Sequence, residues 1–126
     1  MIADTTFLSD LRRERERLTR GPASSFLARH RNERFLTTVI SAGEIAVVFD
    51  SMTAARAFLL PYRILRLTPE IAYVAASVDR DLMEGTGQRL GENDNWIAGF
   101  CRYYGQPIIS RDVAFDRVRG LRRLAY

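Results

Sequence analysis

Four acidic residues are placed where carboxylates can do chemistry. Asp4 ends the short apolar stretch that begins the chain, and Glu44 interrupts the otherwise apolar run Ala-Gly-Glu-Ile-Ala-Val-Val-Phe. Asp94 falls near the start of an expected helix, on its inward face, and Asp112 follows a short apolar segment. Each acid is therefore expected at or near the carboxyl end of a strand or the N-terminus of a helix, positions that share one edge of a parallel sheet.

Carboxylates that gather in one place must bind protons or positive charge, because like charges removed from water are costly. A divalent cation satisfies several carboxylates at once, and ligation by oxygen alone favours Mg²⁺ or Mn²⁺ over zinc. Such a site keeps water ligands, lowers the pKa of a bound water and holds a phosphoryl oxygen. The four acids thus suggest a metal-dependent nuclease.

Each acid also has a structural interpretation that the sequence leaves open. Asp4 and Asp94 are acceptable helix caps, and Glu44 suits the first turn of a helix, where the helix dipole favours an acid. Asp112 is equally suited to a turn.

Composition narrows the chemistry further. The chain has 126 residues, all 19 of its basic residues are arginine, and its formal net charge is +4. Without lysine, a P-loop amine, a Schiff base and a lysine general base are excluded. The single histidine, His30, makes multi-histidine metal sites and Ser-His-Asp triads hard to build. The positive charge favours an acidic partner, for which nucleic acid is the obvious candidate, but composition does not choose among nucleic acids, anionic proteins and lipids.

The surrounding pattern predicts strands that alternate with helices. Thr5 or Thr6 is expected to cap a first helix that continues to about residue 20, and Thr68-Pro69-Glu70 is a clear helix start. This alternation predicts one α/β domain over residues 1–126, with a parallel sheet covered on both faces. The expected strands are 1–4, 35–40, 63–67, 107–109 and 121–126, and the expected helices are 5–20, 23–33, 41–49, 53–60, 68–85 and 93–104.

No segment has the length of a membrane span or the pattern of a signal peptide, and the lone Cys101 cannot form an internal disulfide. We therefore expect a reducing, cytoplasmic setting and no membrane partner.

Four ordered motifs resemble those of the PIN-domain family, and most of all the VapC-type toxins of bacterial type II toxin–antitoxin systems. They are Asp4-Thr5-Thr6-Phe7-Leu8, Ser41-Ala42-Gly43-Glu44-Ile45, the run Gly-Glu-Asn-Asp-Asn-Trp-Ile-Ala over residues 91–98, and the run from Ile109 to Leu121. Any one motif is weak, but four in order, with acids spaced by 40, 50 and 18 residues, are fairly specific and cover essentially the whole chain.

The resemblance implies a three-layer α/β/α sandwich with a mostly parallel five-stranded sheet. It also implies an endoribonuclease that uses Mg²⁺ or Mn²⁺ to cut tRNA, rRNA or mRNA and leaves a 5′-phosphate and a 3′-hydroxyl. By the same resemblance, the chain would form a homodimer and be restrained by a cognate VapB-type antitoxin. The family's catalytic and metal-binding acids carry over to Asp4, Glu44, Asp94 and Asp112, with Glu44 acting directly or through water.

Polar and basic neighbours complete the expected site. Thr5, Thr6 and Ser110 take positions that line the pocket in the family, and Asp116 competes with Asp112 as the fourth acid. Position 6 is often asparagine in the family, and the glycine that frequently follows the Glu44 motif is missing here. Candidate phosphate contacts are Arg111, Arg117 and Arg119. Two alternatives remain: a non-catalytic PIN-like module that binds RNA or protein, and a structure-specific DNA nuclease.

Overall fold

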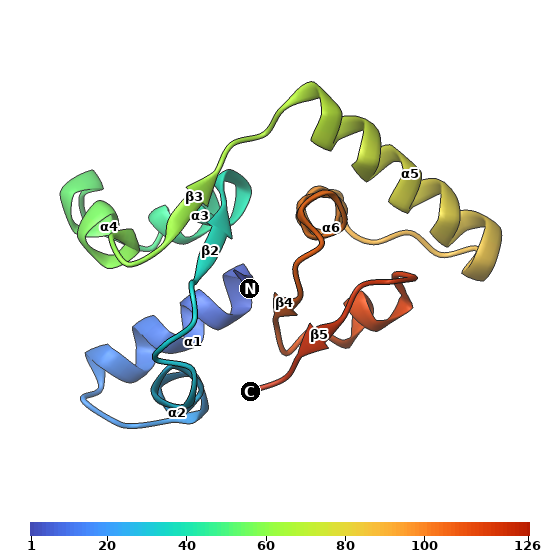
Figure 1. Cartoon of the computed structure of the whole chain (residues 1–126). Coiled ribbons are helices and arrows are strands. Elements are labelled where there is room, and N and C mark those ends of the chain that lie inside the picture. Colours follow the sequence, from blue (N-terminus) through green and yellow to red (C-terminus); the bar gives the residue numbers. More distant parts are fainter.

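A computed structural model describes all residues from 1 to 126, and its five strands form a single parallel sheet (Figure 1). The strand order is β3-β2-β1-β4-β5, and every neighbouring pair is parallel. The elements in chain order are β1 (Ile2–Ala3), α1 (Thr5–Glu16), α2 (Pro22–Arg29), β2 (Leu36–Thr38), α3 (Val39–Ala46), α4 (Met52–Leu59), β3 (Arg63–Leu65), α5 (Pro69–Thr86), α6 (Glu92–Tyr104), β4 (Ile108–Ile109), the 3₁₀ helix η1 (Val113–Arg117) and β5 (Arg123–Leu124).

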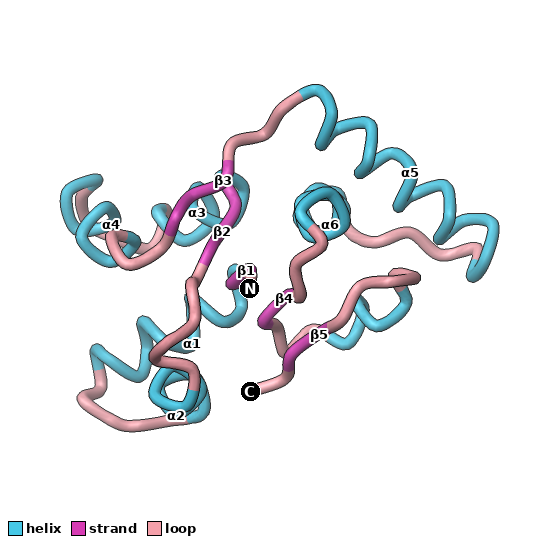
Figure 2. The backbone as a smooth tube through the Cα atoms, in the orientation of Figure 1, coloured by secondary structure: helices cyan, strands magenta, loops and turns pink.

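The sheet lies between two layers of helices because its short strands are apolar on both faces. Ile2 and Ile108 belong to a core shared with α5, α6 and η1, whereas Ala3 and Ile109 belong to a second core shared with α1, α2 and α4. This alternation is the two-residue period of a strand. Figure 2 shows the strands in magenta between the two groups of helices. The expected α/β fold with a five-stranded sheet is confirmed, and the sheet is parallel throughout.

The helix α5 follows from its sequence signals. The Thr68 hydroxyl accepts a hydrogen bond from the Ile71 amide at 3.3 Å, and Pro69 occupies the first turn. At the other end Gly87 takes a left-handed conformation with φ of 67°, which a glycine adopts at little cost.

Three local expectations are corrected. The N-cap of α1 is Asp4 rather than Thr5 or Thr6, since the Asp4 carboxylate accepts from the Thr5 amide. The helix α1 ends at Glu16, short of the expected residue 20. The 3₁₀ helix over Val113–Arg117 has no counterpart among the expected elements.

No helix in the structure combines the length and the apolar character needed to cross a membrane.

Candidate active site

The carboxyl edge of the sheet brings the acidic motifs together. Asp4 follows β1 directly and Ser110 follows β4 directly, and these two strands are parallel neighbours. The side chains meet across 106 residues of sequence, where the Ser110 hydroxyl donates to Asp4 Oδ2 at 2.7 Å. Ligands of parallel α/β sheets bind at this edge, so the topology places the acids where a substrate is expected.

Asp4 is the buried anchor of the site. Only 2% of the residue is exposed. The Thr6 hydroxyl donates to Asp4 Oδ2 at 3.0 Å, and the Thr5 amide donates to Oδ1 at 2.7 Å. Burial nevertheless raises the pKa of Asp4, because desolvation outweighs the hydrogen bonds that favour its charged form. Asp4 is therefore both a helix cap and a carboxylate in need of positive charge.

Asp94 is half-buried and has no hydrogen-bond or ion-pair partner. It is the third residue of α6, whose N-cap is Gly91, so it is not the cap that the sequence left open. Burial raises the pKa of Asp94 to about 6, with further contributions from the negative charges of Asp4, Asp112 and Glu44. Three acids from three other motifs therefore lie close enough to Asp94 for their negative charges to act on it.

Asp112 and Asp116 have different surroundings. Asp112 caps η1 by accepting from the Ala114 amide at 2.8 Å, and its own amide donates to the Ser110 hydroxyl at 3.0 Å. Asp116 is paired with Arg123 through two hydrogen bonds of 2.8 Å, which hold the pKa of this exposed carboxylate below its usual value. The negative charge of Asp112 contributes to the raised pKa of Asp94, whereas that of Asp116 does not. The surroundings therefore favour Asp112 as the fourth acid.

Glu44 is the exposed member of the group. It is the sixth residue of the eight-residue helix α3, so a stabilising position in the first turn does not explain it. The Thr5 hydroxyl donates to Glu44 Oε1 at 2.8 Å, and the side-chain amide of Asn93 donates through Nδ2 to Oε2 at 3.3 Å. Glu44 lines a shallow depression of about 370 Å³ with Asp94 and the start of α6.

The contact with Asn93 was not predicted from the sequence. The only signal is the polar run Gly-Glu-Asn-Asp at residues 91–94, and this run does not identify the partner of Asn93.

The donor chemistry suits a hard divalent cation. None of the four acids takes part in any of the six ion pairs of the protein, although the charge of Arg123 acts on Asp112 from a longer distance. All their donor atoms are oxygen, which matches Mg²⁺ or Mn²⁺. No three histidine, cysteine, aspartate or glutamate side chains are yet arranged to hold one ion. The residues therefore fit the cation in kind and charge, but their side chains do not converge on a single point.

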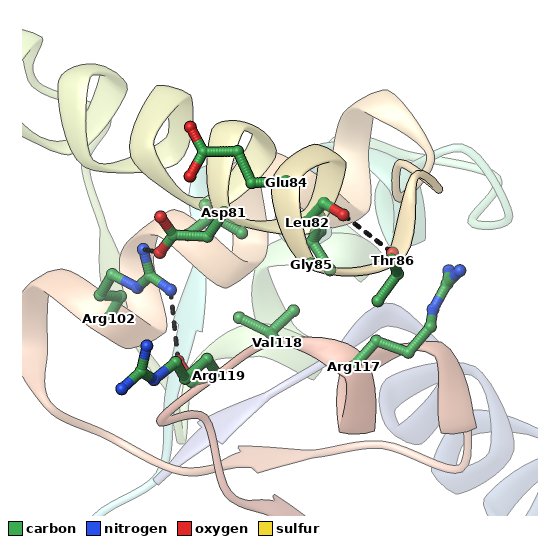
Figure 3. A pocket seen from close by; sticks show the side chains of 10 residues that line it. Asp81, Leu82, Glu84, Gly85, Thr86, Arg102, Arg117, Val118 and Arg119 are labelled. Carbon is green, nitrogen blue, oxygen red and sulfur yellow. Dashed lines mark hydrogen bonds and ion pairs between the residues drawn. The ribbon is translucent and has the colours of Figure 1, made fainter.

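The three candidate phosphate-binding arginines lie in two places. Arg111 is an exposed neighbour of the acids and pairs with Asp10 at 3.1 Å. Figure 3 shows Arg117 and Arg119 in a different hollow, together with Arg102 and the C-terminal end of α5. Of the three, Arg111 alone lies next to an acid of the site in sequence.

These features define a class: an α/β domain with five parallel strands and four neighbouring acids, centred on Asp94, at the carboxyl edge of its sheet. The family model of the PIN domain matches residues 1–121. The chain belongs to the PIN domain family.

Solved structures with the same fold come from several bacterial complexes. A chain of VapBC2 from Rickettsia felis, bound to a DNA fragment from its promoter, superimposes with a TM-score of 0.79 at 14% identity, covering 98% of this chain and 96% of that one. VapBC-1 from nontypeable Haemophilus influenzae gives a TM-score of 0.71 at 20% identity, with 98% and 96% covered. FitAcB from Neisseria gonorrhoeae gives a TM-score of 0.72 at 17% identity, covering 98% of this chain and 95% of that one. No curated protein sequence matches the chain.

Proposed function

We propose that this protein is a metal-dependent endoribonuclease toxin that hydrolyses RNA phosphodiesters and is restrained by a cognate antitoxin. One observation carries the proposal: three carboxylates act on the half-buried Asp94 at the carboxyl edge of the sheet, and no arginine forms an ion pair with any of the four. Family membership supports the nuclease class. The 19 arginines of the chain give it a net positive charge, which attracts a polyanion such as RNA.

Asp4, Asp94 and Asp112 would hold the ion, with Glu44 acting directly or through water. Bound there, Mg²⁺ or Mn²⁺ supplies a Lewis acid for a phosphoryl oxygen and lowers the pKa of a coordinated water. The proposal accounts for the unsatisfied state of Asp94, because a cation offsets both its burial and the repulsion from its neighbours.

Around this group, the chain's own residues position the carboxylates. Ser110 and Thr6 fix one oxygen of Asp4, and the Thr5 amide fixes the other. The Thr5 hydroxyl also holds Glu44 toward the site. Asp94 keeps both oxygens free, so it is the residue we expect to be most sensitive to substitution.

Partners are inferred from the structural neighbours. Several are VapBC or Fit complexes, and one is described as a toxin–antitoxin complex from Klebsiella pneumoniae. By analogy we propose a VapB-type antitoxin as the cognate partner and a homodimer as the assembled form.

A cleavage assay on total RNA tests the function. The wild-type chain should cut RNA with Mg²⁺ or Mn²⁺, and chelator should stop the reaction. Asp94→Asn should lower the rate by more than about a hundredfold, beyond the loss usual for residues outside the ligand shell. Asp50→Asn, an exposed aspartate with no partner, is the matched control and should cut normally.

Two further comparisons sharpen the assay. Asp112→Asn should abolish cutting while Asp116→Asn should not, and the reverse result would reassign the fourth acid. Equal cutting by wild type and Asp94→Asn contradicts the catalytic assignment. Cleavage of DNA in preference to RNA supports the alternative of a DNA nuclease, and retention of RNA without cleavage supports a binding module.

A further inference from the structure

A second polar cluster lies beside the acids and has no part in the proposed reaction so far. At its centre is Asp10 of α1, which accepts hydrogen bonds from Tyr126 Oη at 2.7 Å and Arg13 Nη1 at 3.3 Å. Asp10 also forms an ion pair with Arg111, whose Nη1 lies 3.1 Å from Oδ2. The Asp10 side chain is 15% exposed, whereas that of Arg111 is 56% exposed. A largely buried acid therefore holds an arginine that faces solvent.

This cluster borders a hollow of about 250 Å³ with a surplus of positive charge. Arg13, Arg17 and Arg111 line it, together with Asp10 and Glu14. Both acids are already engaged: Asp10 by Tyr126, Arg13 and Arg111, and Glu14 by the first backbone amides of α2. Three guanidinium groups face two carboxylates, Arg17 has no partner, and Arg111 pairs through Nη1 alone, so the hollow favours an anion as its ligand.

The hollow adjoins the candidate active site along the chain and through side chains. Arg111 stands between Ser110 and Asp112 in sequence. The Tyr126 hydroxyl lies beside the Thr6 hydroxyl, which in turn donates to Asp4. Only Nη1 of Arg111 has a partner, so the rest of its planar fork is free, and a guanidinium fork matches the oxygens of a phosphate.

We propose that this hollow binds a backbone phosphate of the RNA that flanks the scissile one, and that Asp10 and Tyr126 are positioning residues that hold Arg111 for this contact. This inference rests on the proposed function, because the flanking phosphate belongs to the same substrate. Arg111 supplies the phosphate contact itself, and Arg13 and Arg17 add positive charge around it.

A binding measurement tests the inference without requiring cleavage. Fluorescence anisotropy follows a labelled mixed-sequence oligoribonucleotide bound to the full chain in chelator, at several salt concentrations. Arg111→Ala should weaken binding about tenfold and lower the slope of log K against log salt by roughly 0.7, the loss of one phosphate contact to a single strand. Arg34→Ala removes the same charge from an exposed position at the amino edge of the sheet, where the Arg34 carbonyl accepts from the Met1 amino group. This control should change binding less than about twofold, since charge there is largely screened from the site.

Asp10→Asn separates positioning from simple electrostatics. The substitution removes a negative charge, so RNA binding should become tighter if Asp10 acts only through its charge. If Asp10 positions Arg111, RNA binding should become weaker, because Arg111 loses the ion-pair partner that orients it. Tyr126→Phe keeps the ring against Phe7, 4.9 Å between centroids, and should weaken binding in the same direction. Thermal unfolding of each variant verifies that the fold is retained.

Tighter binding by Asp10→Asn, or unchanged binding by Arg111→Ala, overturns the inference. An Arg111→Ala variant that binds RNA normally but loses a protein partner identifies the hollow as a protein contact and also overturns it. If the wild type does not cut RNA but the binding results are as expected, the proposed nuclease activity is contradicted and the phosphate-binding site is not. If RNA is cut, Arg111→Ala should raise KM more than it lowers kcat.

Discussion

At the scale of single residues, Asp94 is where function and stability oppose each other. Its carboxylate is half-buried, has no partner and faces three other acids. In the metal-free protein this arrangement raises its pKa to about 6 from 3.8 in the unfolded chain. The folded state therefore binds more protons between these two pH values, and the free energy of unfolding falls as the pH rises through that window.

Asp94→Asn should therefore stabilise the metal-free protein while it abolishes cleavage. A shift of this size would correspond to about 3 kcal/mol, and partial solvent exposure reduces the expected gain to about 1 kcal/mol. The gain should be present at pH 8 and nearly absent at pH 4. Urea unfolding in chelator at both pH values measures it, and a variant that is less stable than wild type at pH 8 contradicts the electrostatic account.

At the scale of elements, the packing of α6 against α5 positions Asp94. The two helices meet at Gly99, where an added Cβ would lie 2.6 Å from the Cβ of Ala75 and 2.9 Å from its Cα. A glycine inside a helix is normally unfavourable. It is retained here because the two backbones approach too closely for a methyl group.

Gly99→Ala should destabilise the protein by about 1–3 kcal/mol, since overpacking outweighs the gain in helix propensity. Gly43→Ala in α3 is the matched control, because an added Cβ there meets nothing within 4 Å. That substitution should stabilise the protein by up to about 1 kcal/mol. The midpoints of urea unfolding give both values, and an equal gain from the two substitutions would show that α5 and α6 pack less closely than described.

The elements were predictable where the signals are local. The Thr68 cap and Pro69 mark the start of α5, and alternating strands and helices predict a parallel sheet with its ligand edge. The early end of α1 was not predictable, because it accompanies a contact in which Glu14 accepts from the backbone amides of Ala23 and Ser24 in the next helix. Gly21, the N-cap of α2, has no side chain to provide that acceptor, and a contact across nine residues leaves no periodic signal.

Part of the candidate site could likewise be predicted from the sequence, and part of it could not. The four acids follow from the motifs, and the gathering of the other three around Asp94 follows from the topology. The cluster around Asp10 joins α1, the turn after β4 and the segment after β5. Only the folded chain brings these three segments together, so neither spacing nor composition indicates the contact.

At the scale of the whole molecule, charge is unevenly distributed. Four of the 15 acids gather at one edge, which leaves the 19 arginines facing 11 acids elsewhere. A cation that binds this edge stabilises the folded state alone, because the unfolded chain separates the carboxylates.

Mn²⁺ should therefore raise the melting temperature of the wild-type chain. At a free concentration a hundredfold above Kd the stabilisation is about 2.7 kcal/mol, or roughly 10 °C for a domain of this size. Asp94→Asn should lose most of this rise, and Asp50→Asn should keep it. Scanning calorimetry at constant ionic strength makes the comparison, and an equal rise in all three proteins would indicate nonspecific screening.

The hydrogen bond from Ser110 to Asp4 also fixes when during synthesis this site can first exist. Asp4, Glu44 and Asp94 are all synthesised before β4, the strand that carries Ser110 and Asp112 to the side of β1. Until then β1 lacks one of its two neighbours in the sheet, and Asp4 lacks the hydroxyl that fixes it. Assembly of the four acids therefore waits for β4 to pair with β1, and a chain interrupted before β4 should lack the ordered Asp4 on which the site is built.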